Sequence, residues 1–113
     1  MSELQISRES YKRCEVLQVN GRIDSSNAPD FDNALKDVMN DDKHNIVLNL
    51  SSVSYMSSAG LRGLVSAMRE CKKNRGSVVL ASPSDRVNEV LELAGLSSLF
   101  DIFDDETSAV GSF

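Results

Sequence analysis

The sequence predicts one α/β domain built on a mixed, mostly parallel sheet. Two short apolar segments stand near the N-terminus, and from residue 28 onward amphipathic helical patterns alternate with short, β-branched apolar runs. This alternation is typical of parallel strands joined by crossover helices. We expect an N-terminal β-hairpin, about five strands and about four helices, in a single domain over residues 1–113.

The N-terminal segments have the pattern of a β-hairpin. Leu4 and Ile6 alternate with polar residues, which predicts an edge strand with one face in the core. A polar turn around residues 9–10 follows, and residues 14–19 form a second predicted strand that ends at Gly21. The short connection favours antiparallel pairing.

The first helix is marked by its start signals. Ser26 or Asn27 can serve as the N-cap, and Pro29 lies within the first turn, where its missing N–H costs nothing. Apolar residues then recur at three- and four-residue spacing, which predicts one buried helix face. They are Ala28, Phe31, Ala34, Leu35 and Val38.

The central predicted strand spans residues 45–50, and its run of Ile46, Val47 and Leu48 suits a strand buried on both faces. A second amphipathic helix is predicted from about residue 60 to 74. Gly76 is the predicted left-handed residue that ends this helix.

The C-terminal third repeats the pattern of strand and helix. We expect a strand over residues 77–81, a third helix that starts within residues 82–85 and closes at Gly95, and a last strand over residues 99–103. The acidic run at residues 104–106 predicts the start of a short fourth helix.

Composition and charge narrow the class of function. The net charge is −5 with no basic stripe, which argues against nucleic-acid binding and favours protein partners. No apolar run approaches the roughly 20 residues that span a bilayer, and no secretory pattern is visible, so we expect no membrane insertion and a cytoplasmic protein. Cys14 and Cys71 are expected to be reduced thiols, and with His44 as the one histidine we expect no metal site.

The sequence lacks the patterns of common catalytic sites. A nucleophile elbow needs G-x-S-x-G and a histidine that follows the serine, but His44 precedes Ser57 and Ser58. Glycine-rich phosphate loops are missing as well. We therefore expect a protein that is not an enzyme and that holds no cofactor.

The junction between the central strand and the second helix carries the main functional signal. Ser57 and Ser58 lie where the first backbone N–H groups of the helix have no partner within it. A serine at this position can cap the helix. It can also carry a phosphate, because the free N–H groups and the helix dipole stabilise an anion there.

Residues 55–61, Y-M-S-S-A-G-L, resemble the D-S-S-G-L signature of the STAS domain, the fold of bacterial anti-sigma factor antagonists. The sequence differs from that pattern at two positions, since Ser57 replaces the usual aspartate and Ala59 the usual second serine. The further points of resemblance are Gly21, Asp24, Asn49, Leu50, Gly76, Gly95 and Leu96.

The resemblance implies phosphorylation on Ser58, with Ser57 as the alternative and Ser54 less favoured. It also implies two partners, an anti-sigma factor with serine kinase activity and a PP2C-type phosphatase, and an output in transcription through a released sigma factor. The expected partner-binding residues are Asp24, Ser25, Ser57, Ser58, Ala59, Gly60, Arg62 and Gly63.

Two other interpretations remain open at this point. Some stand-alone STAS proteins are accessory subunits of membrane transporters, which would leave the serine unphosphorylated. A related partner-switch module could also be phosphorylated and yet have an output other than a sigma factor.

Overall fold

The computed structural model describes residues 4–113 and confirms the α/β fold, with five strands, four α-helices and one 3₁₀ turn in that range. The strands are β1 (Gln5–Ser10), β2 (Glu15–Ile23), β3 (Asn45–Met56), β4 (Ser77–Ala81) and β5 (Ile102–Phe103). The helices are α1 (Ala28–Asn40), α2 (Ser58–Lys73), α3 (Asp85–Leu93) and α4 (Glu106–Gly111), with the 3₁₀ turn η1 at Ser97–Leu99.

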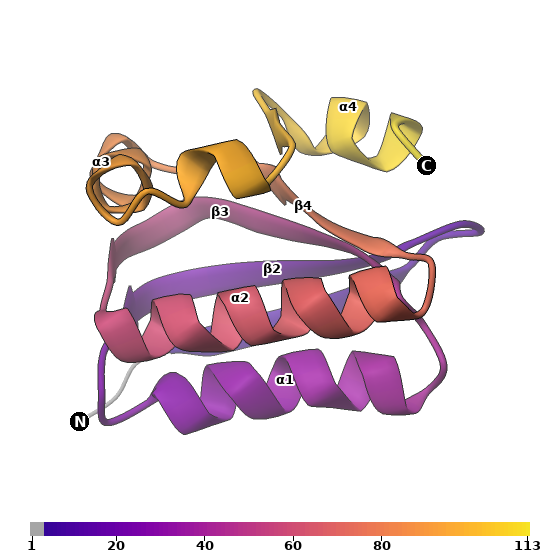
Figure 1. Cartoon of the computed structure of the whole chain (residues 1–113), viewed down its shortest axis with the longest axis horizontal. Helices are drawn as coiled ribbons and strands as arrows, with labels where there is room; N and C mark the ends of the chain where they lie inside the picture. The colour runs from indigo at the N-terminus through magenta and orange to yellow at the C-terminus, as the bar shows by residue number, and fades with distance from the viewer. Residues whose placement is uncertain (1–3) are drawn as a thin grey trace.

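The sheet has the order β1-β2-β3-β4-β5, so strand order follows chain order. β1 pairs with β2 in an antiparallel hairpin, and the other neighbouring strands are parallel. α1 and α2 lie side by side along the sheet (Figure 1). Buried residues of α1, α2 and α3 join one hydrophobic cluster with the sheet.

Alternation along β3 divides the core between the two faces of the sheet. Ile46, Leu48 and Leu50 belong to the cluster with α1 and α2, whereas Val47 points into a second cluster that includes Ala109 of α4. Both faces are buried, which explains why this segment is a continuous apolar run. α4 therefore covers the face of the sheet opposite α1 and α2.

β2 and β3 are longer than the sequence pattern predicts. Gly21 does not end β2; it takes a φ of 123°, and the pairing register with β3 shifts on either side of it while the strand continues to Ile23. Such an irregularity is a β-bulge, and glycine accommodates its positive φ without steric cost. The extension lets β3 continue to Met56 instead of stopping at Leu50.

α3 lies beside the C-terminal half of β3, at the strand edge with which β4 no longer pairs. Pairing between β3 and β4 ends at Asn49 and Ala81. Beyond that point the Ser84 hydroxyl, at the N-cap of α3, donates a 2.7 Å hydrogen bond to the carbonyl oxygen of Val53. This contact closes part of the exposed strand edge, a device that protects sheet edges in general.

Helix ends also differ in detail from the predictions. α2 begins at Ser58 and ends at Lys73, and the left-handed residue after it is Arg75, with φ 64°, not Gly76. Gly76 has a different requirement, because a Cβ atom there would overlap the backbone of His44. Gly95 has φ 71° and closes α3 as predicted.

Three further boundaries are corrected. The turn of the hairpin lies at residues 11–14, since β1 continues to Ser10 and β2 begins at Glu15. Asn27 is the N-cap position of α1, but its side chain does not cap the helix. The predicted last strand is mostly replaced by η1, which leaves the short strand Ile102–Phe103.

Candidate functional site

Ser57 holds the start of α2 against the sheet. It is the N-cap residue, and its hydroxyl accepts a hydrogen bond from the Gly60 N–H at 3.3 Å. Its own N–H donates to the carbonyl oxygen of Ile23 at 2.8 Å, which joins the end of β3 to the end of β2. Ser57 is half-buried and occupied by this structural role.

Ser58 is the first residue of α2 and is exposed. Within residues 4–113 its hydroxyl has no hydrogen-bond partner, in contrast to that of Ser57. The hydroxyl therefore lies in solvent at the positive end of a 16-residue helix. An anion on this oxygen would be stabilised by the helix dipole and by free backbone N–H groups.

Gly60 lies beneath this surface. It is buried, and a Cβ atom at this position would lie 2.7 Å from Ile23 Cγ2 and 2.9 Å from Met56 Cγ. These distances are too short for any side chain, so glycine is required for α2 to approach the ends of β2 and β3. Gly60, one of the expected partner-binding residues, is thus buried and has a packing role.

Asp24 organises the loop between β2 and α1. Its Oδ1 accepts hydrogen bonds from the Ser26 hydroxyl at 2.6 Å and from the Ser26 N–H at 2.9 Å. The pKa of Asp24 is lowered, first by the Ser26 hydroxyl hydrogen bond, because these donors stabilise the ionised carboxylate. Asn27 completes the loop, with its amide Oδ1 accepting from the Asp24 N–H at 2.9 Å.

The α1–α2 groove brings four of the expected partner-binding residues together. It is a shallow groove of about 410 Å³ between the first turns of the two helices. Ser25 from the β2–α1 loop lies on one side, and Ala59, Arg62 and Gly63 of α2 lie on the other. Its lining residues are Ser25, Ala28, Pro29, Asp32, Ala59, Arg62, Gly63 and Ser66.

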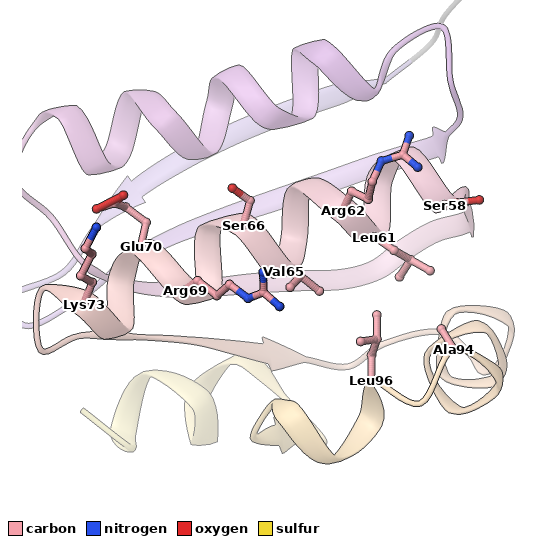
Figure 2. Close-up of a pocket in the computed structure, with 10 residues that line it drawn as sticks. All are labelled: Ser58, Leu61, Arg62, Val65, Ser66, Arg69, Glu70, Lys73, Ala94 and Leu96. Carbon is pink, nitrogen blue, oxygen red and sulfur yellow. The ribbon is translucent and has the colours of Figure 1, made fainter.

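A second and larger groove, of about 680 Å³, runs along α2 on its other side (Figure 2). We call it the α2 groove. Ser58 and Arg62 lie at one end, and the connection between α3 and η1 forms the opposite wall. Its lining residues are Ser58, Leu61, Arg62, Val65, Ser66, Arg69, Glu70, Lys73, Ala94 and Leu96.

Sequence reasoning missed most of this groove. The available signal was the recurrence of cations at Arg62, Arg69 and Lys73 on one helix. The opposite wall, Ala94 and Leu96, comes from a distant part of the chain, so only the fold brings it into place.

Tyr55 lies next to the same end of the sheet, between two arginines. The guanidinium of Arg22 is 4.8 Å from the centre of the Tyr55 ring, and that of Arg86 is 6.0 Å away. Cation–π attraction at such distances links β2, β3 and the first turn of α3. These contacts stiffen the strand that leads to Ser57.

The only histidine in the sequence, His44, lies too far from the two serines to act as their catalytic base. His44 immediately precedes β3 and Ser57 immediately follows it, so the whole length of this 12-residue strand separates them. Within the part of the chain that the structure describes, no cluster of three or more metal-ligating side chains is found. In that same part, no helix is long and apolar enough to cross a membrane.

Comparison with known proteins identifies the family. The model of the STAS domain matches residues 5–109, which is nearly the whole chain. This chain belongs to the STAS domain family. A curated relative, the anti-sigma-B factor antagonist of Staphylococcus aureus (strain NCTC 8325 / PS 47), is 27% identical over 99 residues, or 88% of this chain and 92% of the relative.

Solved structures share the fold. An anti-sigma factor antagonist from Mycobacterium paratuberculosis superposes with a TM-score of 0.88 at 24% identity, over 97% of this chain and 93% of that one. The anti-sigma factor antagonist SpoIIAA in its unphosphorylated form gives a TM-score of 0.81 at 22% identity, with 94% and 93% covered. The phosphorylated form of Bacillus SpoIIAA gives 0.74 at 20% identity, with 96% and 97% covered.

Proposed function

We propose that this protein is a cytoplasmic, non-enzymatic anti-sigma factor antagonist controlled by phosphorylation on Ser58. In its unphosphorylated form it binds an anti-sigma factor that is also a serine kinase, and so frees a sigma factor for transcription. Phosphorylation releases the kinase, and a PP2C-type phosphatase restores the binding form. The observation that carries the proposal is the exposed, unengaged Ser58 hydroxyl at the start of α2.

The difference between the two adjacent serines supports the choice of Ser58. Ser57 is half-buried and caps the helix, so modification of its oxygen would remove the cap. Ser58 can enter the active site of a kinase without disturbing the fold. The relatives support the class of partner, since one is named an anti-sigma-B factor antagonist and SpoIIAA has been solved in both phosphorylation states.

In the proposed phosphorylation step, the kinase supplies the ATP and the base, and this chain supplies the hydroxyl. The kinase moves the γ-phosphoryl group of its ATP to the Ser58 oxygen, the hydroxyl proton leaves to a base of the kinase, and ADP is released. The phosphatase later hydrolyses the phosphoester to the hydroxyl and inorganic phosphate. ATP and Mg²⁺ belong to the kinase in this scheme, and this chain supplies only the acceptor oxygen.

Release of the partner follows from charge. A phosphoserine carries about −1.5 to −2 charges at neutral pH. The start of α2 stabilises this anion within the protein, whereas a partner surface shaped for a neutral hydroxyl must desolvate it. A loss of about 3 to 4 kcal/mol of binding free energy would lower affinity several hundredfold, enough to separate the two proteins.

The proposal is tested with Ser58 variants and the partner recovered from native cell extract. Ser58→Asp should lose binding, and Ser58→Ala should bind as tightly as the unmodified protein yet gain no phosphoryl group when the partner and ATP are added. Isothermal titration and intact-mass spectrometry measure the two properties. Ser57→Ala is the matched control, because it should still be phosphorylated.

Equal affinity of Ser58→Asp and Ser58→Ala would count decisively against the scheme. Recovery of a membrane transporter with an unphosphorylated chain would favour the accessory-subunit interpretation. A phosphorylated chain whose deletion leaves transcription unchanged would favour a partner switch with another output.

A further inference from the structure

We propose that the α2 groove binds an acidic amphipathic helix of the partner protein. The inference rests on the proposed function for the identity of the partner, and it adds the chemistry of the contact. The groove itself is defined by its shape, its apolar floor and the cations on its rim, all of which the unphosphorylated chain already presents.

The floor of the groove is apolar and comes from both walls. Leu61 and Val65 lie one helical turn apart on α2, and Leu96 stands opposite them; Figure 2 shows Leu61 and Leu96 pointing toward each other. Next to Ala94, at the wall formed by the α3–η1 connection, Leu93 is 82% exposed.

The rim of the groove is cationic, although the protein as a whole is acidic. Arg62, Arg69 and Lys73 are all exposed, and among residues 4–113 none of them forms an ion pair. Glu70 is the one carboxylate that lines the groove, and its Oε2 accepts a hydrogen bond from Asn74 at 3.1 Å. In a chain of net charge −5 this local excess of positive charge favours a partner that carries carboxylates.

The length of the groove favours a helix as the occupant. Its lining residues on α2 extend from Ser58 to Lys73, the full 16 residues of the helix, or about 24 Å at 1.5 Å per residue. Cations border the apolar residues along this line, with Arg62 near one end, Arg69 further along and Lys73 at the other end. A helix with a leucine stripe flanked by glutamate or aspartate would meet both, as in other helix-in-groove complexes.

Ser58 lies at the end of the same groove, which connects the contact to the switch. Ser58 and Arg62 are four residues apart on α2, the spacing at which helical side chains are neighbours. A phosphoryl group on Ser58 would compete with partner carboxylates for Arg62 and would repel the others along the rim. An acidic segment would therefore be displaced by a modification at one end of its site.

The test uses a synthetic amphipathic peptide as long as α2, with leucines on one face and glutamates beside them, and a second peptide with lysine in place of each glutamate. NMR titration of the isotope-labelled full chain locates the binding and measures affinity. We expect the glutamate peptide to shift the resonances of Val65, Arg69 and Leu96 and to weaken as salt is raised. The lysine peptide should leave them in place.

Charge reversal provides the matched comparison. Arg69→Glu combined with Lys73→Glu should lower the affinity for the glutamate peptide by at least about tenfold. Arg13→Glu combined with Lys43→Glu changes the net charge equally at exposed positions outside the groove, and should change affinity by less than about twofold. Both variants keep Ser58, so the phosphorylation test can be repeated on each.

The proposal is overturned if the lysine peptide binds as well, if the glutamate peptide binds elsewhere or not at all, or if both charge reversals have the same effect. Concentration-dependent shifts of the groove resonances without peptide would identify a second copy of this chain as the occupant, and would also overturn it. Failure of the proposed function would give a different result. In that case Ser58→Asp and Ser58→Ala would bind the partner with equal affinity, while the groove would still bind the glutamate peptide and not the lysine peptide.

Discussion

At the scale of single residues, two adjacent serines have different surroundings. The Ser57 hydroxyl is bonded to the N–H of Gly60, and the Ser58 hydroxyl is exposed and unengaged among the described residues. Neighbouring side chains at a helix start point in different directions, because one precedes the first helical residue and the other belongs to the first turn. The cap and the proposed phosphoacceptor are thus separate groups.

This separation predicts a difference in stability between two alanine variants. Ser57→Ala should lower the free energy of unfolding by about 1 kcal/mol through loss of the cap. Ser58→Ala should change it little or raise it slightly, because alanine is the better helix former. Urea denaturation followed by circular dichroism measures both; equal destabilisation would show that Ser57 is not the effective cap.

At the scale of secondary-structure elements, the first turn of α2 is set by its contact with β2 and β3. The contact is close because Gly60 has no side chain, and Ile23 and Met56 fill the space where a Cβ would lie. Both of those side chains are fully or almost fully buried, so neither can move away at low cost. Glycine at this position determines where the exposed serine is presented.

A pair of glycine variants tests this contact. Gly60→Ala should destabilise the protein by about 1 to 3 kcal/mol through overpacking. A Cβ at Gly63, one turn further along the same helix, would meet only Asp32, with Oδ1 nearest at 3.4 Å. Gly63→Ala should therefore be neutral or stabilising by up to about 1 kcal/mol, since alanine favours helix. Denaturant midpoints at constant slope give the comparison, and a neutral Gly60→Ala would contradict the packing argument.

At the scale of the whole molecule, the sheet separates two hydrophobic clusters. Cys71 of α2 belongs to the cluster on the α1 and α2 face, and Cys14, which immediately precedes β2, to the cluster with α4. Both are buried and free, as expected for structural thiols. Burial raises the pKa of the Cys71 thiol to about 11, and it raises that of Cys14 as well.

The two thiols should therefore be inert while the protein is folded. At about pH 8 both remain protonated and inaccessible, so a chromogenic disulfide reagent should react slowly with the native chain and rapidly with both thiols in urea. The variants Cys14→Ser and Cys71→Ser each leave one thiol, so they show which cysteine accounts for each kinetic phase of the reaction. Rapid reaction of either thiol in the folded protein would contradict the burial of its side of the sheet.

The predictable parts of the fold are those governed by local pattern. The apolar run at Ile46, Val47 and Leu48, the stripe of α1 and the stop at Gly95 were all readable, because periodicity and backbone conformation are local properties. The strand ends were not readable. β2 continues through Gly21 because its pairing with β3 compensates for the weakening effect of a glycine within a strand.

The candidate site divides in the same way. Ser57 and Ser58 could be placed at a helix start from the chain alone, because apolar residues at helical spacing begin shortly after them, at Leu61. The burial of Gly60 could not be predicted, since it depends on Ile23, which is distant in sequence. The wall of the α2 groove at Leu96 was missed for the same reason.

The amino-acid sequence by itself determined the fold class, the order of the elements and the position of two hydroxyls at the start of one helix. It could do so because hydrophobic period and capping chemistry act over a few neighbouring residues. Only the tertiary structure decided which hydroxyl faces solvent and which cations border an apolar groove. Those properties depend on which distant segments cover each side of α2, and that is a result of packing the whole chain around one sheet.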